Sequence, residues 1–302
     1  MTLQDFAEEI RKQVQEKMGT GYEVECQNML ENNGVRILKL SVTEIGSRVS
    51  FLITLNGYYE NGDWSDMEAY SEDTAEEITR LYHEKNPVST WAEKQTEVIK
   101  DFSAIRDKIM FRLIHTEMNR KQLETVPHIP FLDLSVVFYI PQEFDDGMCS
   151  LLIHNDLMDS WGVTVEQLYE LALENTPNML PIKMAELNMT EEGKMDLETK
   201  TDIENLKEGV LYHVSNPIGI FGAAVLMYPD FLQRCAQACG KNLVIIPGSV
   251  HEVLLATGGE HEDLEQLSEL VKNINETELP RKEWLSDHAY LYEYKTGRLT
   301  AA

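Results

Sequence analysis

One short loop of this chain carries three residue types that hydrolases use. Within residues 247–252, Ser249 supplies a hydroxyl group, His251 an imidazole and Glu252 a carboxylate. In such a set the imidazole takes the hydroxyl proton and the carboxylate orients the imidazole. The loop follows an expected buried strand, as catalytic loops often do. Ser249, His251 and Glu252 are therefore the catalytic candidates of a hydrolase-like enzyme.

The same residues also have a purely structural interpretation. A nucleophile elbow requires Gly-x-Ser-x-Gly, and His251 stands where the second glycine would be. Ser249 could instead be a turn residue, with His251 and Glu252 on the polar face of the next strand. The sequence leaves both interpretations open and assigns no catalytic residue firmly.

Histidine and cysteine spacing does not predict a metal site. The pairs His251–Glu252 and His261–Glu262 begin like a zinc-protease motif, which needs a second histidine three residues after the glutamate. Leu255 and Glu265 stand at those positions, so that class of enzyme is excluded.

Cys235 and Cys239 are four residues apart, but no second pair completes a tetrahedral site. Small buried side chains are the expected role of both cysteines.

Two other patterns resemble ligand sites only in part. The segment Gly219–Gly222 lacks the Gly-Lys-Ser/Thr end of a phosphate loop and the third glycine of a dinucleotide fingerprint. Glycines in an apolar run more often permit close backbone approach. Asp63, Asp66 and Glu68 lie beside Trp64 but miss the spacing of a calcium loop, which favours an exposed loop. We expect no cofactor and no metal.

The charge balance restricts the partners of the protein. The 302 residues include 52 Asp and Glu against 26 Lys and Arg, a formal charge of −26. Such a surface repels nucleic-acid phosphates and anionic lipids, so direct nucleic-acid binding and membrane binding are not expected. The alternative in which the acidity is itself the function is a DNA mimic. The N-terminal residues do not resemble a signal peptide, and four cysteines make no disulfide scaffold. A reduced, cytoplasmic protein is expected.

Helical periodicity and turn residues predict the elements that position these groups. Asn33–Gly34 tolerates the positive φ angles of a tight hairpin turn. Thr74 with Glu77, and Thr90 with Glu93, fit capping boxes at helix starts. The first 125 residues are expected to form an α-β-β-β-α-α subdomain: a helix at 3–18, strands at 22–29, 35–42 and 49–55, a helix over 74–83 and a long helix over 90–119.

Two close prolines in Val126–Pro130 enforce an extended connection and place the domain boundary there, giving subdomains 1–125 and 126–302. Residues 180–208 fit no pattern. The other expected elements are strands at 132–140, 148–153, 210–214, 243–246, 253–255 and 290–294, helices starting at 164, 230 and 264, and a turn at Pro247–Gly248. The fold class is α+β, with mostly antiparallel sheets backed by helices.

Several segments together resemble an uncharacterised domain-of-unknown-function family found in gut Firmicutes, over nearly the whole chain. They are Asn33–Val35, Leu55–Tyr59, Val126–His128 with the strand after it, Gly222–Ala224 and Ile245–Val253. In that family the last motif usually reads Pro-Ser-Ser-x-His-Glu, so Gly248 is a departure. The resemblance implies a bacterial cytosolic protein and supplies no activity, cofactor or catalytic residue.

The missing catalytic spacing and the acidic surface favour a noncatalytic binding or interaction protein with a protein partner. The alternatives are the hydrolase-like enzyme using Ser249, His251 and Glu252, and the DNA mimic.

Overall fold

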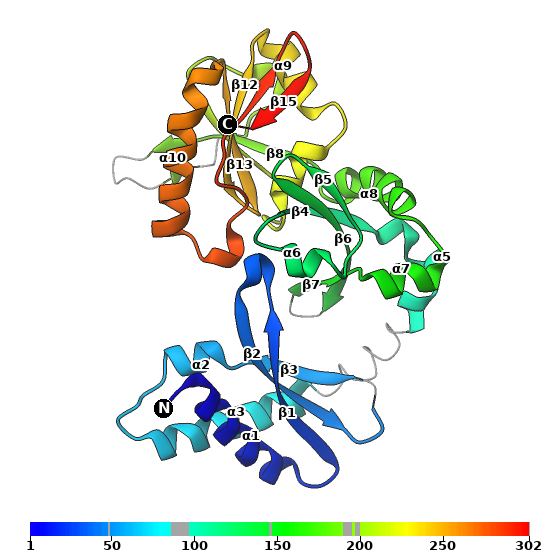
Figure 1. Cartoon of the computed structure of the whole chain (residues 1–302), viewed down its shortest axis with the longest axis vertical. Helices are drawn as coiled ribbons and strands as arrows, with labels where there is room; N and C mark the ends of the chain where they lie inside the picture. The colour runs from blue at the N-terminus through cyan, green and yellow to red at the C-terminus, as the bar shows by residue number, and fades with distance from the viewer. Residues whose placement is uncertain (48, 86–96, 145–146, 190–194, 197–199, 302) are drawn as a thin grey trace. The chain divides into compact units, whose positions relative to one another are not determined.

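The computed structural model describes residues 1–301 except 48, 86–96, 145–146, 190–194 and 197–199. The chain divides into two compact units (Figure 1). The first contains Met1–Glu31 and Val35–Asp101, and the second contains Asn32–Gly34 and Phe102–Ala302.

The first unit is a three-stranded antiparallel sheet with helices. Its order is β1-β2-β3, and β1 and β2 pair as the Asn33–Gly34 hairpin signal predicted. Helix α1 begins at a capping box of Thr2 and Asp5 and ends before Gly19, whose φ is 78°. The elements are α1 (Leu3–Met18), β1 (Tyr22–Leu30), β2 (Arg36–Glu44), β3 (Ser50–Thr54), α2 (Asn56–Glu60) and α3 (Met67–Lys85).

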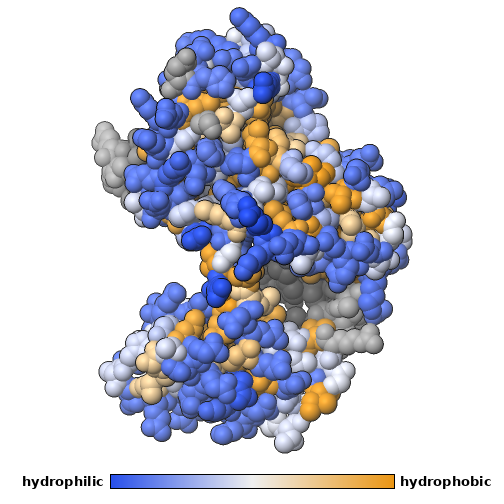
Figure 2. Space-filling model, in the orientation of Figure 1, coloured by the Kyte–Doolittle hydropathy of each residue, from blue (hydrophilic) through white to orange (hydrophobic). Residues whose placement is uncertain are grey.

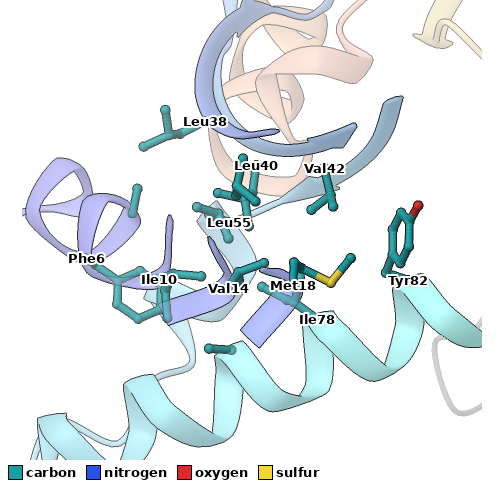
Figure 3. Packing of buried hydrophobic residues seen from close by; sticks show 13 residues of the cluster. Phe6, Ile10, Val14, Met18, Leu38, Leu40, Val42, Leu55, Ile78 and Tyr82 are labelled. Atoms are coloured by element: carbon teal, nitrogen blue, oxygen red, sulfur yellow. The ribbon is translucent and has the colours of Figure 1, made fainter. Parts of the chain in front are cut away.

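The core of this unit lies between the helices and one face of the sheet. Phe6 and Ile10 of α1, Leu40 of β2 and Ile78 of α3 are fully buried in it. Figure 3 shows side chains of β2 pointing toward α1 and α3. The helical spacing of the α1 residues was the signal that predicted this buried face.

The structure corrects two helices that were predicted from sequence. Helix α3 begins at Met67, so Thr74 lies inside the helix and its hydroxyl group donates to the carbonyl of Tyr70. The long helix expected over 90–119 does not continue to its predicted end, because Met110–His115 forms strand β4. The residues of its predicted capping box, Thr90 and Glu93, lie outside the described residues.

The second unit contains a four-stranded antiparallel sheet. Strand β6 is central, pairing with β4 on one side and with β5 and β7 on the other. Its elements are α5 (Phe102–Ile105), β4 (Met110–His115), α6 (Arg120–Leu123), β5 (His128–Phe131), β6 (Leu134–Phe144), β7 (Gly147–Leu152), α7 (Asn155–Trp161) and α8 (Val165–Met179).

This unit also contains a six-stranded antiparallel sheet, in the order β15-β14-β12-β13-β11-β8, and a two-stranded sheet of β9 and β10. Val244 of β12 packs against Leu264 of α10, while its neighbours Leu243 and Ile245 point the other way and are also fully buried. Both faces of the sheet are therefore covered. The remaining elements are β8 (Lys183–Glu186), β9 (Asn188–Met189), β10 (Met195–Asp196), β11 (Leu211–Ser215), η4 (Gly222–Met227), α9 (Phe231–Cys239), β12 (Leu243–Ser249), β13 (Glu252–Thr257), α10 (His261–Glu278), β14 (Tyr290–Glu293) and β15 (Arg298–Ala301).

Two details of the second unit differ from the prediction. Pro247–Gly248 lies within β12, because an irregularity in the pairing with β13 between Pro247 and Ser249 lets the strand continue past the proline. The division between the units falls at Asp101–Phe102, before the Val126–Pro130 boundary expected from the prolines. The reason is that β4 pairs with β6 and so joins the second unit.

The α+β class with antiparallel sheets backed by helices is confirmed. Hydrophilic side chains cover most of the visible face of each unit (Figure 2). In the described part of the chain, no helix combines the length and the apolar character needed to cross a membrane.

Candidate functional site

The end of β12 holds Ser249 and Glu252 in direct contact. Ser249 is only 2% exposed, and its hydroxyl group donates to Glu252 Oε1 at 2.6 Å. The Ser249 Oγ atom in turn accepts the backbone N–H of His251 at 3.0 Å. The serine proton is thus already held by a carboxylate, and the serine oxygen by a backbone amide. This arrangement closes a turn between β12 and β13.

The ring of His251 is bonded elsewhere. Its Nδ1 accepts the backbone N–H of Phe221 at 3.2 Å, and its carbonyl oxygen accepts the Ser215 hydroxyl at 2.7 Å. An imidazole that accepts at Nδ1 carries its proton on Nε2 when it is neutral. Neither nitrogen then remains free to take the proton of Ser249. The structure brings Ser249 and Glu252 together and directs the His251 ring to Phe221.

The loop that approaches His251 is built for close contact. Phe221 has a φ of 55°, in the left-handed region that a bulky side chain seldom occupies. At Gly222 an added Cβ would collide with the Ser215 hydroxyl and the His251 carbonyl, so only glycine fits. The expected role of these glycines, close backbone approach, is confirmed for Gly222, although it lies in a 3₁₀ turn and not in a strand.

Phe221 lies at the centre of an aromatic and cationic cluster. The guanidinium carbon of Arg112 lies 4.4 Å from its ring centroid, and the His251 ring is stacked at 6.0 Å. Tyr139 meets Phe221 at its edge, with centroids 5.4 Å apart. Arg112 and Tyr139 share a face of the sheet because Tyr139 is opposite Met110, two residues before Arg112.

Arg112 is an enclosed cation without an anionic partner. Burial lowers the pKa of Arg112 to about 10, and Tyr139 only partly opposes this shift. Its Nε is buried without a hydrogen-bond partner, and among the described residues no carboxylate pairs with its guanidinium group. The residue still keeps part of its surface open to solvent. A buried charge of this kind is costly unless another group compensates it.

Tyr139 is the second polar group of the cluster. Its ring is 4% exposed, and burial raises the pKa of Tyr139 to about 12, so its hydroxyl group keeps its proton at neutral pH. No described residue forms a hydrogen bond with that hydroxyl group. Arg112, Tyr139 and Phe221 therefore form one site, which we call the Arg112 cluster.

The Arg112 cluster was not predicted from the sequence. The spacing of apolar residues up to Leu113 fits a helix, and in that helix Arg112 lies off the buried stripe. The signal that could have identified it is an arginine between apolar neighbours in Met110–His115. In a strand buried on both faces, such a residue is enclosed.

The other candidates have structural roles. Burial raises the pKa of the Cys235 thiol to about 12, and Cys239 Sγ donates to the carbonyls of Ala236 and Lys241. Asp63 is exposed and accepts from Ser65, while Glu68 lies in the first turn of α3. Within the described ranges, no group of three His, Cys, Asp or Glu side chains could hold a metal ion.

The chain is similar to a known protein family. A family model described as "Family of unknown function (DUF5688)" matches residues 3–294. Neither a curated protein nor a solved structure matches the chain.

Proposed function

The chain belongs to the DUF5688 family, whose function is unknown, and we propose that it is a noncatalytic binding protein that takes a small anionic molecule at Arg112. The observation that carries this proposal is the enclosed guanidinium group that no carboxylate among the described residues neutralises. The chain has 52 acidic residues, so a carboxylate of the protein itself could have served as the counter-ion of Arg112. A bound anion would supply the missing charge.

The residues around the site support binding without catalysis. The Ser249 hydroxyl group donates to Glu252, and His251 accepts from a backbone amide. Neither pair is arranged for transfer of a proton from serine to histidine. The hydrolase-like alternative would require both hydrogen bonds to break first.

Substitution of Arg112 tests the proposal. Titration of the protein with sodium acetate and with inorganic phosphate, followed by NMR, should show saturable shifts of resonances from β4 and the Phe221 loop. Arg112→Met should remove these shifts, because the only enclosed cation of the cluster is gone. Arg120→Met is the matched control, since Arg120 is exposed on α6 and pairs with Glu117.

Saturable shifts in Arg120→Met and their loss in Arg112→Met would support the proposal. Identical titrations of the wild-type protein and Arg112→Met would contradict it. The absence of saturable shifts with every anion would contradict it as well.

The proposed setting is the bacterial cytoplasm. The strongly acidic composition and the free thiols of Cys26, Cys235 and Cys239 support it. A protein partner remains a prediction from the sequence.

A further inference from the structure

Resting on the proposed function, we infer that the anion bound at the Arg112 cluster is a monoanionic carboxylate, held by the Arg112 guanidinium group with the Tyr139 hydroxyl group as a second donor. The charge of the cluster, the shape of its donors and the occupied backbone amides favour this ligand class.

The charge of the cluster favours a monoanion. Arg112 is the one cation of the cluster, and Tyr139 is the other titratable group that acts on it. A monoanion neutralises a single guanidinium group, whereas a dianion would leave one negative charge enclosed. The whole chain carries a formal charge of −26, so each additional negative charge on a ligand meets more repulsion.

The shape of the donors favours a planar carboxylate. A guanidinium group presents paired N–H donors in one plane, which matches the two oxygen atoms of a carboxylate. No described residue uses these donors of Arg112, and its Nε is buried without a partner. The protonated hydroxyl group of Tyr139 adds a donor beside them.

The backbone amides near the cluster disfavour a phosphate. Phosphate sites commonly use several free amides at a helix start. Here the amide of Phe221 donates to His251 Nδ1, that of Ala223 to the Val250 carbonyl, and that of Ala224 to the Phe221 carbonyl. The amides at the start of η4 are thus largely occupied, so the cluster lacks the cradle that a tetrahedral dianion requires.

NMR titrations at constant chloride concentration and pH 7.5 test this inference. The probes are acetate and benzoate as planar carboxylates, nitrate as a planar monoanion, and sulfate and inorganic phosphate as tetrahedral anions. Acetate or benzoate should bind at least about tenfold more tightly than sulfate or phosphate. Tyr139→Phe should weaken carboxylate binding about three- to tenfold, as expected for one lost hydrogen bond.

Two variants of Arg112 separate the effect of its charge from the effect of the planar guanidinium shape. Arg112→Lys keeps the charge and loses the planar fork, so it should bind acetate more weakly than the wild-type protein and lose the preference for acetate over sulfate. Arg112→Met should bind none of the probes. Arg120→Met again serves as the control, and the NMR spectrum of each variant reports whether it is folded.

The outcomes distinguish the two proposals. Tighter binding of sulfate or phosphate at Arg112 would overturn the carboxylate assignment and leave anion binding standing. Nitrate bound as tightly as acetate, with no effect of Tyr139→Phe, would also overturn it. Probes that bind equally to the wild-type protein and Arg112→Met would overturn the proposed function itself.

Discussion

Arg112 lies between Phe111 and Leu113, which are buried in β4, and its guanidinium group rests on the ring of Phe221. The stem of such a side chain packs like an apolar residue, while its charge loses hydration. In the free protein that loss is not compensated by a carboxylate among the described residues. Arg112, which would bind the ligand, therefore lowers the stability of the ligand-free protein.

The first prediction follows from this cost. Without ligand, Arg112→Met should raise the free energy of unfolding by about 1–3 kcal/mol, since methionine keeps much of the stem and removes the buried charge. Urea denaturation followed by circular dichroism measures the change. Arg120→Met, at an exposed position, should stay within about 0.5 kcal/mol of wild type. A less stable Arg112→Met would mean that Arg112 serves packing and not a ligand.

The second prediction concerns His213 on β11. Burial lowers the pKa of His213, and the nearby Glu252 opposes the shift. Its folded pKa is therefore below its unfolded pKa of about 6.5, so the unfolded state takes up a proton first as the pH falls through that value. The stability that neutral His213 contributes is fully present above the unfolded pKa, and it is lost as the pH falls from the unfolded to the folded pKa. His213→Gln should show a smaller loss of unfolding free energy between pH 7.5 and pH 5 in urea denaturation. Equal losses in the two proteins would contradict it.

At the scale of single residues, the residues of the 247–252 loop could be identified from the sequence, but their hydrogen bonds could not. Ser249, His251 and Glu252 were identified by type and spacing, and the structure shows where their hydrogen bonds go. Spacing along the chain cannot tell whether a hydroxyl group donates to an imidazole or to a carboxylate. Arg112 was missed because its role depends on strand pairing with β6 and on Phe221, which lies far along the chain.

Among the elements, the turn residues of the β1–β2 connection have more than a local role. Asn33 has a φ of 58° and is 1% exposed, and it belongs to the second unit. Its amide nitrogen donates to the carbonyls of Arg281 and Trp284, and it exchanges two hydrogen bonds with Asn119. Asn33 thus adopts the conformation that the turn requires and also forms hydrogen bonds with buried polar groups.

Two substitutions separate these contributions of Asn33. Asn33→Gly keeps the conformation and loses the side-chain hydrogen bonds, so the free energy of unfolding should fall by about 2–4 kcal/mol. Asn33→Ala loses the same bonds and adds strain at positive φ, for about 1 kcal/mol more. Chemical denaturation measures both. Asn61→Gly, at an exposed position in the first unit, is the control. Equal effects of glycine and alanine would show that strain is absent.

Elements with local signals were predictable, and those that depend on distant pairing were not. Helix α1 has a cap, a periodic apolar face and a terminal glycine, so its bounds follow from sequence. The apolar residues of β4 also fit the helical spacing of the segment before it. Only the pairing with β6 makes this segment a strand. The chain after Pro247 continues as a strand because a pairing irregularity accommodates the proline, and sequence patterns do not show such irregularities.

For the whole molecule, the formal charge of −26 acts on stability as well as on partners. Like charges repel in the compact state and are relieved by unfolding or by salt. The ion pairs of the described residues are mostly between exposed side chains, where each contributes little. The protein should therefore be most sensitive to ionic strength when salt is low.

A salt titration tests this expectation. Raising sodium chloride from about 10 mM to about 150 mM shortens the screening length from about 30 Å to about 8 Å. The melting temperature should rise, by about 2–4 °C for each kcal/mol of repulsion that is relieved. Calorimetry measures it, and the rise should level off at higher salt. Arg112→Met should show the same rise, which separates screening from chloride bound at Arg112. A flat or falling melting temperature would contradict the prediction.

The left-handed backbone of Phe221 has a consequence for laboratory evolution. That conformation costs about 1–2 kcal/mol for a residue with a side chain, and Phe221 supports the same guanidinium group whose burial is costly. A library selected only for resistance to heat would replace Arg112 with an apolar residue before it changed Phe221, because glycine at position 221 would relieve the backbone strain but lose the ring contacts with Tyr139 and His251. The heat-resistant survivors would be proteins that no longer recognise the ligand, and the positions that changed first would mark the binding site.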